Sequence, residues 1–116
     1  MKLLIAIIRP GQLEQVQNEL KDVLDEQDNF RLTIEQVEGH GRQEGRSEVY
    51  RGRRIVPHLV EKIKVTIALN DDYVEPAIDA IVRGARTGKV GDGKILVLPM
   101  EDCIRIRTGE RGPGAI

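Results

Sequence analysis

Apolar residues follow one another almost without interruption from Lys2 to Ile8, in the stretch KLLIAII. A short apolar run of this kind, rich in isoleucine, predicts a central β-strand that is covered on both faces. After Pro10 and Gly11, apolar residues recur at steps of three and four positions, which predicts an amphipathic helix. The apolar positions of this helix are Leu13, Val16, Leu20 and Val23. The stretch from Phe30 to Gly39 then alternates apolar and polar residues, as expected for a strand with one solvated face.

The second half of the chain repeats this plan. Lys62 to Leu69 alternates like a strand, and Asn70-Asp71-Asp72 offers side-chain caps for a following helix. The apolar positions of that helix are Val74, Ala77 and Ile81. Pro76 is expected in its first turn, where proline does least harm. Two further strands are predicted, KILVLP from Lys94 to Pro99 and a short alternating one, CIRIRTG, from Cys103 to Gly109.

Two strand-helix-strand units in tandem predict an α/β fold of the ferredoxin-like type. In this arrangement a four-stranded antiparallel sheet carries both helices on one face, and a short strand follows at the C-terminal side. Right-handed crossovers make this topology the economical choice. A chain of 116 residues forms one such domain, spanning residues 1–116.

A polar insert separates the two halves, from Gly39 to about His58. It contains four glycines and five arginines and shows little apolar periodicity. A compact domain rarely carries about twenty such residues unless they bind something, although a solvated hairpin without function is the alternative. We therefore expect a flexible partner-binding loop over residues 39–58.

Composition narrows the possible functions. The net charge is −1, so no global field favours nucleic acid or an anionic membrane, and an anion site has to be local. Aromatic residues make up only 3%, too few for a surface that stacks bases. The apolar run at the start is too short for a signal peptide or a membrane span. With a single cysteine, these features fit a cytoplasmic protein.

The stretch RTGKVGDGKI, from Arg86 to Ile95, is the first candidate anion site. Its glycines allow backbone N–H groups to converge on an anion, and its lysines add charge. The spacing does not match a P-loop, because Ile95 replaces the hydroxyl residue after Lys94. On spacing alone, a helix C-cap followed by a tight turn is as good an interpretation as a phosphate site.

Paired arginines favour the phosphate interpretation. Arg105 and Arg107 lie two positions apart in a predicted strand, and so on one face, where an anion can bridge the two guanidinium groups. Solubilising residues of an edge strand are the alternative. Arg42, within GHGRQEG, is a candidate third arginine. No metal-ligand spacing or catalytic constellation stands out, so the residues favour anion binding over catalysis.

Taken in order along the chain, the motifs IIRP, VEGHGRQEGRSEVYRG, TGKVGDGKI and IRIRTGE resemble the PII signal-transduction proteins, which are trimeric sensors of nitrogen status. The resemblance spans nearly the whole chain. It implies a homotrimer with nucleotide sites in the clefts between subunits, where ATP and ADP compete. It also implies regulation of a partner protein, an ammonium transporter above all, through the long loop.

The resemblance also implies roles for individual residues. The phosphates of ATP or ADP would meet the loop of Gly91, Asp92, Gly93 and Lys94 together with Arg42, Arg105 and Arg107. Thr33 would lie near the adenine. With Mg-ATP bound, 2-oxoglutarate would chelate the same Mg²⁺, for which Gln43 supplies the side-chain ligand. Lys62 would pair with the distal carboxylate of 2-oxoglutarate, and backbone amides from Gly41 to Gly45 would help to hold it.

The resemblance implies that the segment from Gly39 to Arg54 transmits the signal to the partner, and that its Arg51 enters the transporter pore. Membrane contact is expected only through that partner. The chain departs from the family at the usual modification targets, because Ile55 replaces a tyrosine and Arg53 replaces a serine, although Ser47 and Tyr50 lie nearby. Covalent control of the usual kind is therefore not expected.

Two smaller departures remain. The link from Asp25 to Arg31 is longer than usual, which predicts a longer surface loop, and His40 stands where an aromatic residue is frequent. Two rival functions stay open. One is a sensor that keeps ATP but binds another small metabolite, and the other is a small ferredoxin-like enzyme such as an acyl phosphatase.

Overall fold

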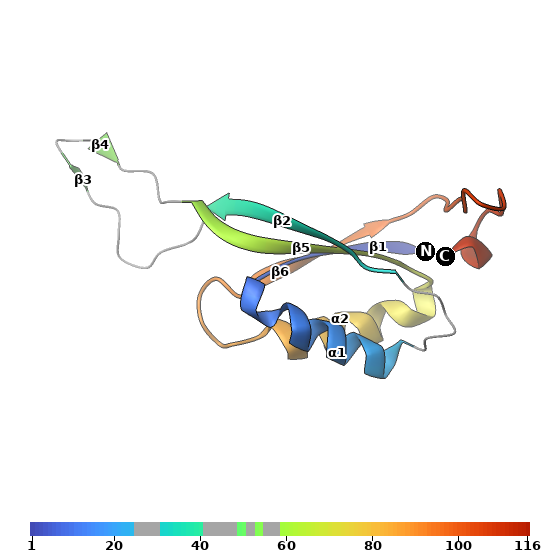
Figure 1. Ribbon diagram of the computed structural model, residues 1–116, viewed down its shortest axis with the longest axis horizontal. Coiled ribbons are helices and arrows are strands. Elements are labelled where there is room, and N and C mark those ends of the chain that lie inside the picture. Colours follow the sequence, from blue (N-terminus) through green and yellow to red (C-terminus); the bar gives the residue numbers. More distant parts are fainter. Residues whose placement is uncertain (25–30, 41–48, 51–52, 55–58) are drawn as a thin grey trace.

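The computed structural model describes residues 1–24, 31–40, 49–50, 53–54 and 59–116. Four antiparallel strands form its main sheet, in the spatial order β2, β5, β1, β6. Their bounds are β1 Lys2–Ile8, β2 Thr33–His40, β5 Leu59–Leu69 and β6 Gly93–Pro99. The helices α1 (Leu13–Val23) and α2 (Asp71–Ala85) both lie on one face of this sheet (Figure 1). The predicted ferredoxin-like fold is confirmed.

Short elements complete the chain. A 3₁₀ turn, Pro10–Gln12, connects β1 to α1, and another, Pro113–Ala115, lies near the C-terminal end. Two-residue strands β3 (Val49–Tyr50) and β4 (Arg53–Arg54) pair with each other inside the predicted insert. The pairing of β2 with β5 continues through Gly39 with Val60 to His40 with Leu59, so the main sheet reaches both ends of that insert. None of the described helices is long and apolar enough to cross a membrane.

The core lies between the helices and the central strands. Alternate residues of β1 and β5 face the helices and are buried, as the period of two in a strand requires. The predicted stripe of α1 is confirmed by the burial of Val16 and Leu20, and that of α2 by Val74, Ala77 and Ile81. The strand residues that they cover are Leu4, Ala6, Ile8, Ile63, Val65, Ile67 and Leu69.

The opposite face of the sheet is apolar at its centre but uncovered in the single chain. The residues of β1 on this face, Leu3, Ile5 and Ile7, are only half-buried. Their neighbours on β6, Leu98 and Leu96, keep 40% and 45% of their surface exposed. The prediction that β1 is covered on both faces is therefore wrong for the single chain, because the helices cover only one side.

The start of α2 differs from the prediction in two respects. Asn70 precedes the helix but makes no side-chain cap, and its side-chain amide donates instead to the Pro113 carbonyl at 3.1 Å. Because the helix begins at Asp71, Pro76 lies in its second turn rather than its first. Pro76 is exposed, so the carbonyl of Asp72, which loses its helical partner there, faces the solvent side.

The backbones of the two helices are in close contact at Gly84. A Cβ atom on this residue would lie 2.7 Å from the Cα atom and 2.8 Å from the backbone nitrogen of Val16. These are main-chain atoms, which cannot rotate away as the end of a side chain would. A residue without a side chain is therefore required where α2 crosses α1.

The substitution Gly84→Ala should destabilise the protein, although alanine has the higher helix propensity. The propensity gain is about 1 kcal/mol, whereas overpacking against a backbone costs about 1–3 kcal/mol. We expect a net loss of up to about 2 kcal/mol in the free energy of unfolding, measured by urea denaturation. Gly11→Ala is the control, because no atom lies within 4 Å of its added Cβ. Equal stability of the two variants would contradict the tight crossing.

Candidate functional site

The glycine-rich loop between α2 and β6 is organised around the carboxylate of Asp92. This carboxylate accepts hydrogen bonds from the backbone N–H groups of Thr87 at 2.8 Å and Gly88 at 2.9 Å, and from the Thr87 hydroxyl. It also accepts from Nε of Arg9 at 3.1 Å. The Thr87 hydrogen bonds above all, with help from Arg9 and Gly88, hold the pKa of Asp92 well below its usual range. Asp92 therefore closes the loop as an anion at neutral pH.

Two cations from the sheet hold the tip of the same loop. Nη2 of Arg9 donates to the Val90 carbonyl at 2.6 Å, and Nζ of Lys62 donates to the Gly91 carbonyl. A Cβ placed on Gly91 would lie 3.2 Å from the Arg9 nitrogen and 3.6 Å from that of Lys62. Both cationic groups thus converge on one point, where Asp92 is the one carboxylate that contacts Arg9 among the described residues. The loop carries a local excess of positive charge.

Glycine is required at Gly91, two residues before β6, and at Gly93, the first residue of β6. Gly91 has φ +99° and Gly93 has φ +102°, a region that side chains disfavour. A Cβ on Gly93 would also lie 1.7 Å from the Ile7 carbonyl oxygen, so the strand starts flush against β1. Lys94 follows, exposed on the open face of the sheet. The positive φ values and the close approach to β1 support the turn interpretation, and the anion cradle stays a prediction.

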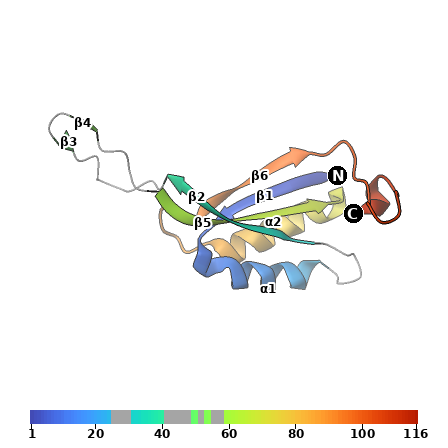
Figure 2. The same ribbon diagram turned by 45° about the horizontal axis from the view of Figure 1, so that its top comes forward.

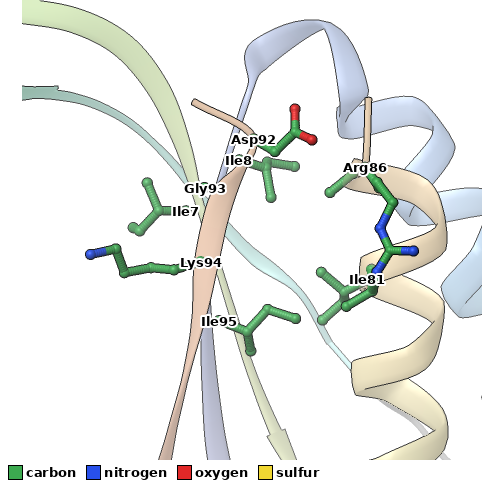
Figure 3. A pocket seen from close by; sticks show the side chains of 10 residues that line it. Ile7, Ile8, Ile81, Arg86, Asp92, Gly93, Lys94 and Ile95 are labelled. Atoms are coloured by element: carbon green, nitrogen blue, oxygen red, sulfur yellow. The ribbon is translucent and has the colours of Figure 1, made fainter. Parts of the chain in front are cut away.

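A cavity of about 330 Å³ lies on the other side of this strand, between β6 and α2. Ile8, Ile81 and Ile95 line it, and Arg86 stands at its side (Figure 3). Figure 3 also shows that Lys94 leaves β6 on the side away from Ile81 and that the Asp92 carboxylate points away from the isoleucines. The cavity is thus apolar, although it borders the charged loop.

The segment after β6 is not the strand that its alternation predicts. Ile104 and Arg111 form an isolated bridge, and a turn lies between them. The backbone N–H of Arg105 donates to the Glu110 carbonyl at 2.9 Å, and that of Gly109 donates to the Arg105 carbonyl at 2.7 Å. Gly109 adopts φ +73°, which reverses the chain. The predicted strand from Cys103 to Gly109 is therefore wrong, because these local hydrogen bonds close a turn instead.

Although they lie in a turn rather than a strand, Arg105 and Arg107 still lie near each other. Arg105, Arg107 and Arg31 line one hollow, together with Ala115 and Ile116. Nη1 of Arg105 contacts Oε2 of Glu110 at 3.2 Å, and its Nη2 donates to the Gly114 carbonyl at 3.2 Å. The guanidinium group of Arg105 is therefore held in place, and this hollow forms a second cationic cluster.

The two cationic clusters lie at opposite ends of the sheet within one chain. Gly93 pairs with Ile8 at one end of β1, whereas Pro99 pairs with Lys2 at the other end. At a rise of about 3.3 Å per residue, these two ends are roughly 20 Å apart. Figure 1 shows the loop before β6 beside the start of α1, and the C-terminal turn beside the N-terminus; Figure 2 shows the same separation. One chain therefore does not bring its predicted phosphate ligands together.

The other predicted site residues divide between these regions or lie outside the described residues. Lys62 belongs to the first cationic cluster, which Arg9, Lys62 and Lys94 form at the loop between α2 and β6 and which we call the loop cluster. Thr33 is exposed on β2 and pairs with Thr66, which in turn pairs with Ile5 near the middle of β1. Gly41, Arg42, Gln43 and Arg51 lie outside the described residues, as do Ser47 and Ile55. Among the described residues, no group of three or more His, Cys, Asp or Glu side chains forms a metal site.

Sequence reasoning missed Arg9, Arg31 and Thr87 as members of these clusters. Arg9 was visible as the polar end of the first apolar run, followed by a proline that stops the strand there. Thr87 lies five residues before Asp92, a distance at which a tight loop brings the two together. Arg31 carries no pattern of its own, because the fold alone places it beside Arg105 and Arg107.

The substitution Asp92→Asn should lower the stability of the protein at pH 7, because it removes the charged acceptor shared by Thr87, Gly88 and Arg9. A carboxyl whose pKa is lowered in the folded state stabilises that state above its unfolded pKa of about 3.9. This contribution declines as the pH falls below about 4. The difference between the urea midpoints of the two proteins should therefore stay constant from pH 7 to about 5 and begin to narrow as the pH falls toward 3. Asp79→Asn on α2 is the control, and a constant difference at every pH would contradict the role of the charge.

Comparisons with known proteins complete the site description. A family model described as "Nitrogen regulatory protein P-II" matches residues 1–110. The chain is 49% identical to "Nitrogen regulatory protein GlnK1" of Methanosarcina mazei, over all of this chain and 97% of that protein. It is 47% identical to "Nitrogen regulatory protein P-II" of Bradyrhizobium diazoefficiens and 44% identical to the protein of that name in Azospirillum brasilense, over the full length of each. The chain belongs to the P-II family of nitrogen regulatory proteins.

Proposed function

We propose that this protein is a sensor that binds ATP or ADP between neighbouring copies and reports the bound nucleotide to a partner. The observation that carries this proposal is the division of its cationic residues into two clusters at opposite ends of the sheet. Each cluster by itself is half of a phosphate site. Its relatives are named as regulatory proteins rather than enzymes, which supports binding in place of catalysis.

The loop cluster supplies the half that cradles phosphate. Gly91 and Gly93 adopt positive φ, a backbone conformation that can turn N–H groups toward an anion, and Lys94 is exposed beside them. Asp92 serves this half through the loop that it closes, since a carboxylate would repel a phosphate directly. The second half consists of Arg105 and Arg107, with Arg42 as a further predicted ligand and Thr33 beside the adenine.

A head-to-tail ring of copies would join the two halves. Heterologous contacts of this kind close into rings when the rotation permits, and three copies give the trimer that the family resemblance implies. The uncovered apolar face around Leu3, Ile5, Leu96 and Leu98 supports such an assembly, because an exposed patch of this kind marks an interaction surface. The site is complete only between copies.

The second ligand in this proposal is 2-oxoglutarate, held through Mg²⁺ by Gln43 and through its distal carboxylate by Lys62, with backbone amides from Gly41 onward. Lys62 already bonds to the Gly91 carbonyl of the phosphate loop. A ligand that recruits Lys62 therefore acts on the loop that holds the nucleotide. Such coupling is reciprocal and typically amounts to about 1–3 kcal/mol.

The output would pass through residues 39–58, which the main sheet reaches on both sides through the pairing of His40 with Leu59. Ligands at Lys62 and Gly91 lie near this end of the sheet, so they can bias the conformation of the insert. The partner would be an ammonium transporter, contacted by Arg51. The protein itself would reside in the cytoplasm and meet the membrane only through this partner.

The double variant Arg105→Ala/Arg107→Ala should weaken ATP binding at least about tenfold, because each arginine contributes a charge-assisted contact. Isothermal titration calorimetry measures the affinity, and sedimentation equilibrium checks that the trimer persists. Arg83→Ala is the control, since this arginine pairs with Glu19 between the helices. If ATP bound equally well to both variants and the wild type, the second half of the site would be wrongly assigned.

The substitution Lys62→Met should abolish the tightening of ATP binding that Mg²⁺ and 2-oxoglutarate cause. Because Lys62 also holds the Gly91 carbonyl of the phosphate loop, a smaller loss of affinity for ATP alone is expected. Lys64→Met is the matched control, because Lys64 lies two residues further along the same strand face and pairs with Glu35 at 3.8 Å. ATP affinity is titrated with and without 2-oxoglutarate. Indifference of the wild type to 2-oxoglutarate would support the rival function, a sensor of another metabolite.

A further inference from the structure

Ile106 is the most exposed large apolar side chain among the described residues, with 99% of its surface accessible. It lies in the turn after β6, directly between Arg105 and Arg107. No apolar residue in the described part of the chain covers it. A fully exposed isoleucine contributes nothing to the core of its own chain, and Ile106 lies between two predicted ligands.

The apolar cavity between β6 and α2 has the complementary property. Its volume of about 330 Å³ is large enough to admit an aliphatic side chain, and Ile8, Ile81 and Ile95 form the apolar part of a lining that also includes Arg86. β6 is the edge strand of the sheet, and Val97, beyond the cavity on the same strand face, keeps 48% of its surface exposed. The cavity and the edge beside it therefore form an uncovered apolar site.

The cavity and the phosphate loop share the same short stretch of chain. Asp92, Gly93 and Lys94 belong to this stretch and also line the cavity. Consecutive Cα atoms are about 3.8 Å apart, so Ile106 cannot be far from the point that Arg105 and Arg107 reach. A copy that delivers these arginines to the Lys94 side of β6 brings Ile106 to the edge of the strand, where the cavity opens.

We propose that Ile106 of one copy inserts into the cavity between β6 and α2 of the next copy. This anchor rests on the proposed ring assembly and adds a specific contact to it. The isoleucine excludes water beside the nucleotide phosphates, and the flanking arginines stay on the charged side. The anchor therefore positions Arg105 and Arg107 on the neighbouring loop even before a nucleotide binds.

A cysteine pair tests this contact directly. Val82 lines the cavity and is half-buried on α2, so Ile106→Cys and Val82→Cys are combined in a Cys103→Ser background. Within one chain the two positions are at opposite ends of the sheet, beyond the reach of a disulfide, which needs Cα atoms within about 7 Å. Mild oxidation should therefore yield covalent species of two and three chains. The control pairs Val82→Cys with Leu59→Cys, because Leu59 is also exposed, at 58%.

The oligomeric state is measured by sedimentation equilibrium of the reduced protein. A trimer without cross-links from the Ile106 pair, or with equal cross-links from the Leu59 pair, would overturn the anchor and leave the ring assembly intact. A monomer would overturn the proposed assembly itself. The two failures are therefore distinguishable.

A second variant measures the strength of the anchor. Ile106→Ser should raise the concentration at which the trimer half-dissociates by about tenfold or more, as expected for a desolvated interface centre. Because Ile106 lies outside the core of its own chain, folding of the variant, followed by circular dichroism, should be unchanged. Leu59→Ser is the control. Dissociation of Ile106→Ser at the wild-type concentration would contradict the anchor.

Discussion

The pairing of β1 with both of its neighbours along its whole length is the constraint on which the rest of the structure depends. Each of its seven residues pairs with β5 on one side and with β6 on the other. This register places Leu4, Ala6 and Ile8 under the helices and turns the remaining residues to the open face. It also sets the distance between the two cationic clusters, because β6 runs from one end of β1 to the other.

At the Ile8 end of β1, the strand register also determines the geometry of the loop between α2 and β6. Gly93 lies so close to the Ile7 carbonyl that only glycine fits. This contact fixes the position at which β6 begins relative to β1. Arg9 continues β1 by one residue and reaches back to Asp92 and to the Val90 carbonyl. The loop is thus tied to the sheet by the start of β6 and by two charged side chains, Arg9 and Lys62.

Periodicity predicted the core elements well because burial on one face is a local pattern. The run of Lys2 to Ile8 and the stripes of both helices are found where apolar spacing places them. The predictions are wrong where the conformation is determined by hydrogen bonds to residues distant in sequence or by competing local hydrogen bonds. CIRIRTG alternates like a strand, but the Glu110 carbonyl captures the Arg105 N–H and closes a turn. Asn70 has the right residue type for a cap, but the distant Pro113 carbonyl takes its side chain.

The candidate site was predictable as a set of residue types but not as an arrangement. Glycines next to a lysine indicate an anion site, and so do two arginines two positions apart. Both signals depend only on charge and backbone freedom, so they do not require knowledge of where the residues lie in the fold. Their separation along β1 depends on sheet order, which no local pattern contains.

That separation has a physical consequence for a sensor. A site completed within one chain would bind its anion whatever the neighbours do, whereas a site divided between copies couples binding to the contact between them. In the proposed assembly, an apolar anchor and a charged site would meet on opposite sides of one edge strand, β6. The anchor would supply affinity between copies without using the charges. The charges at Lys94, Arg105 and Arg107 would then remain available to distinguish one bound nucleotide from another.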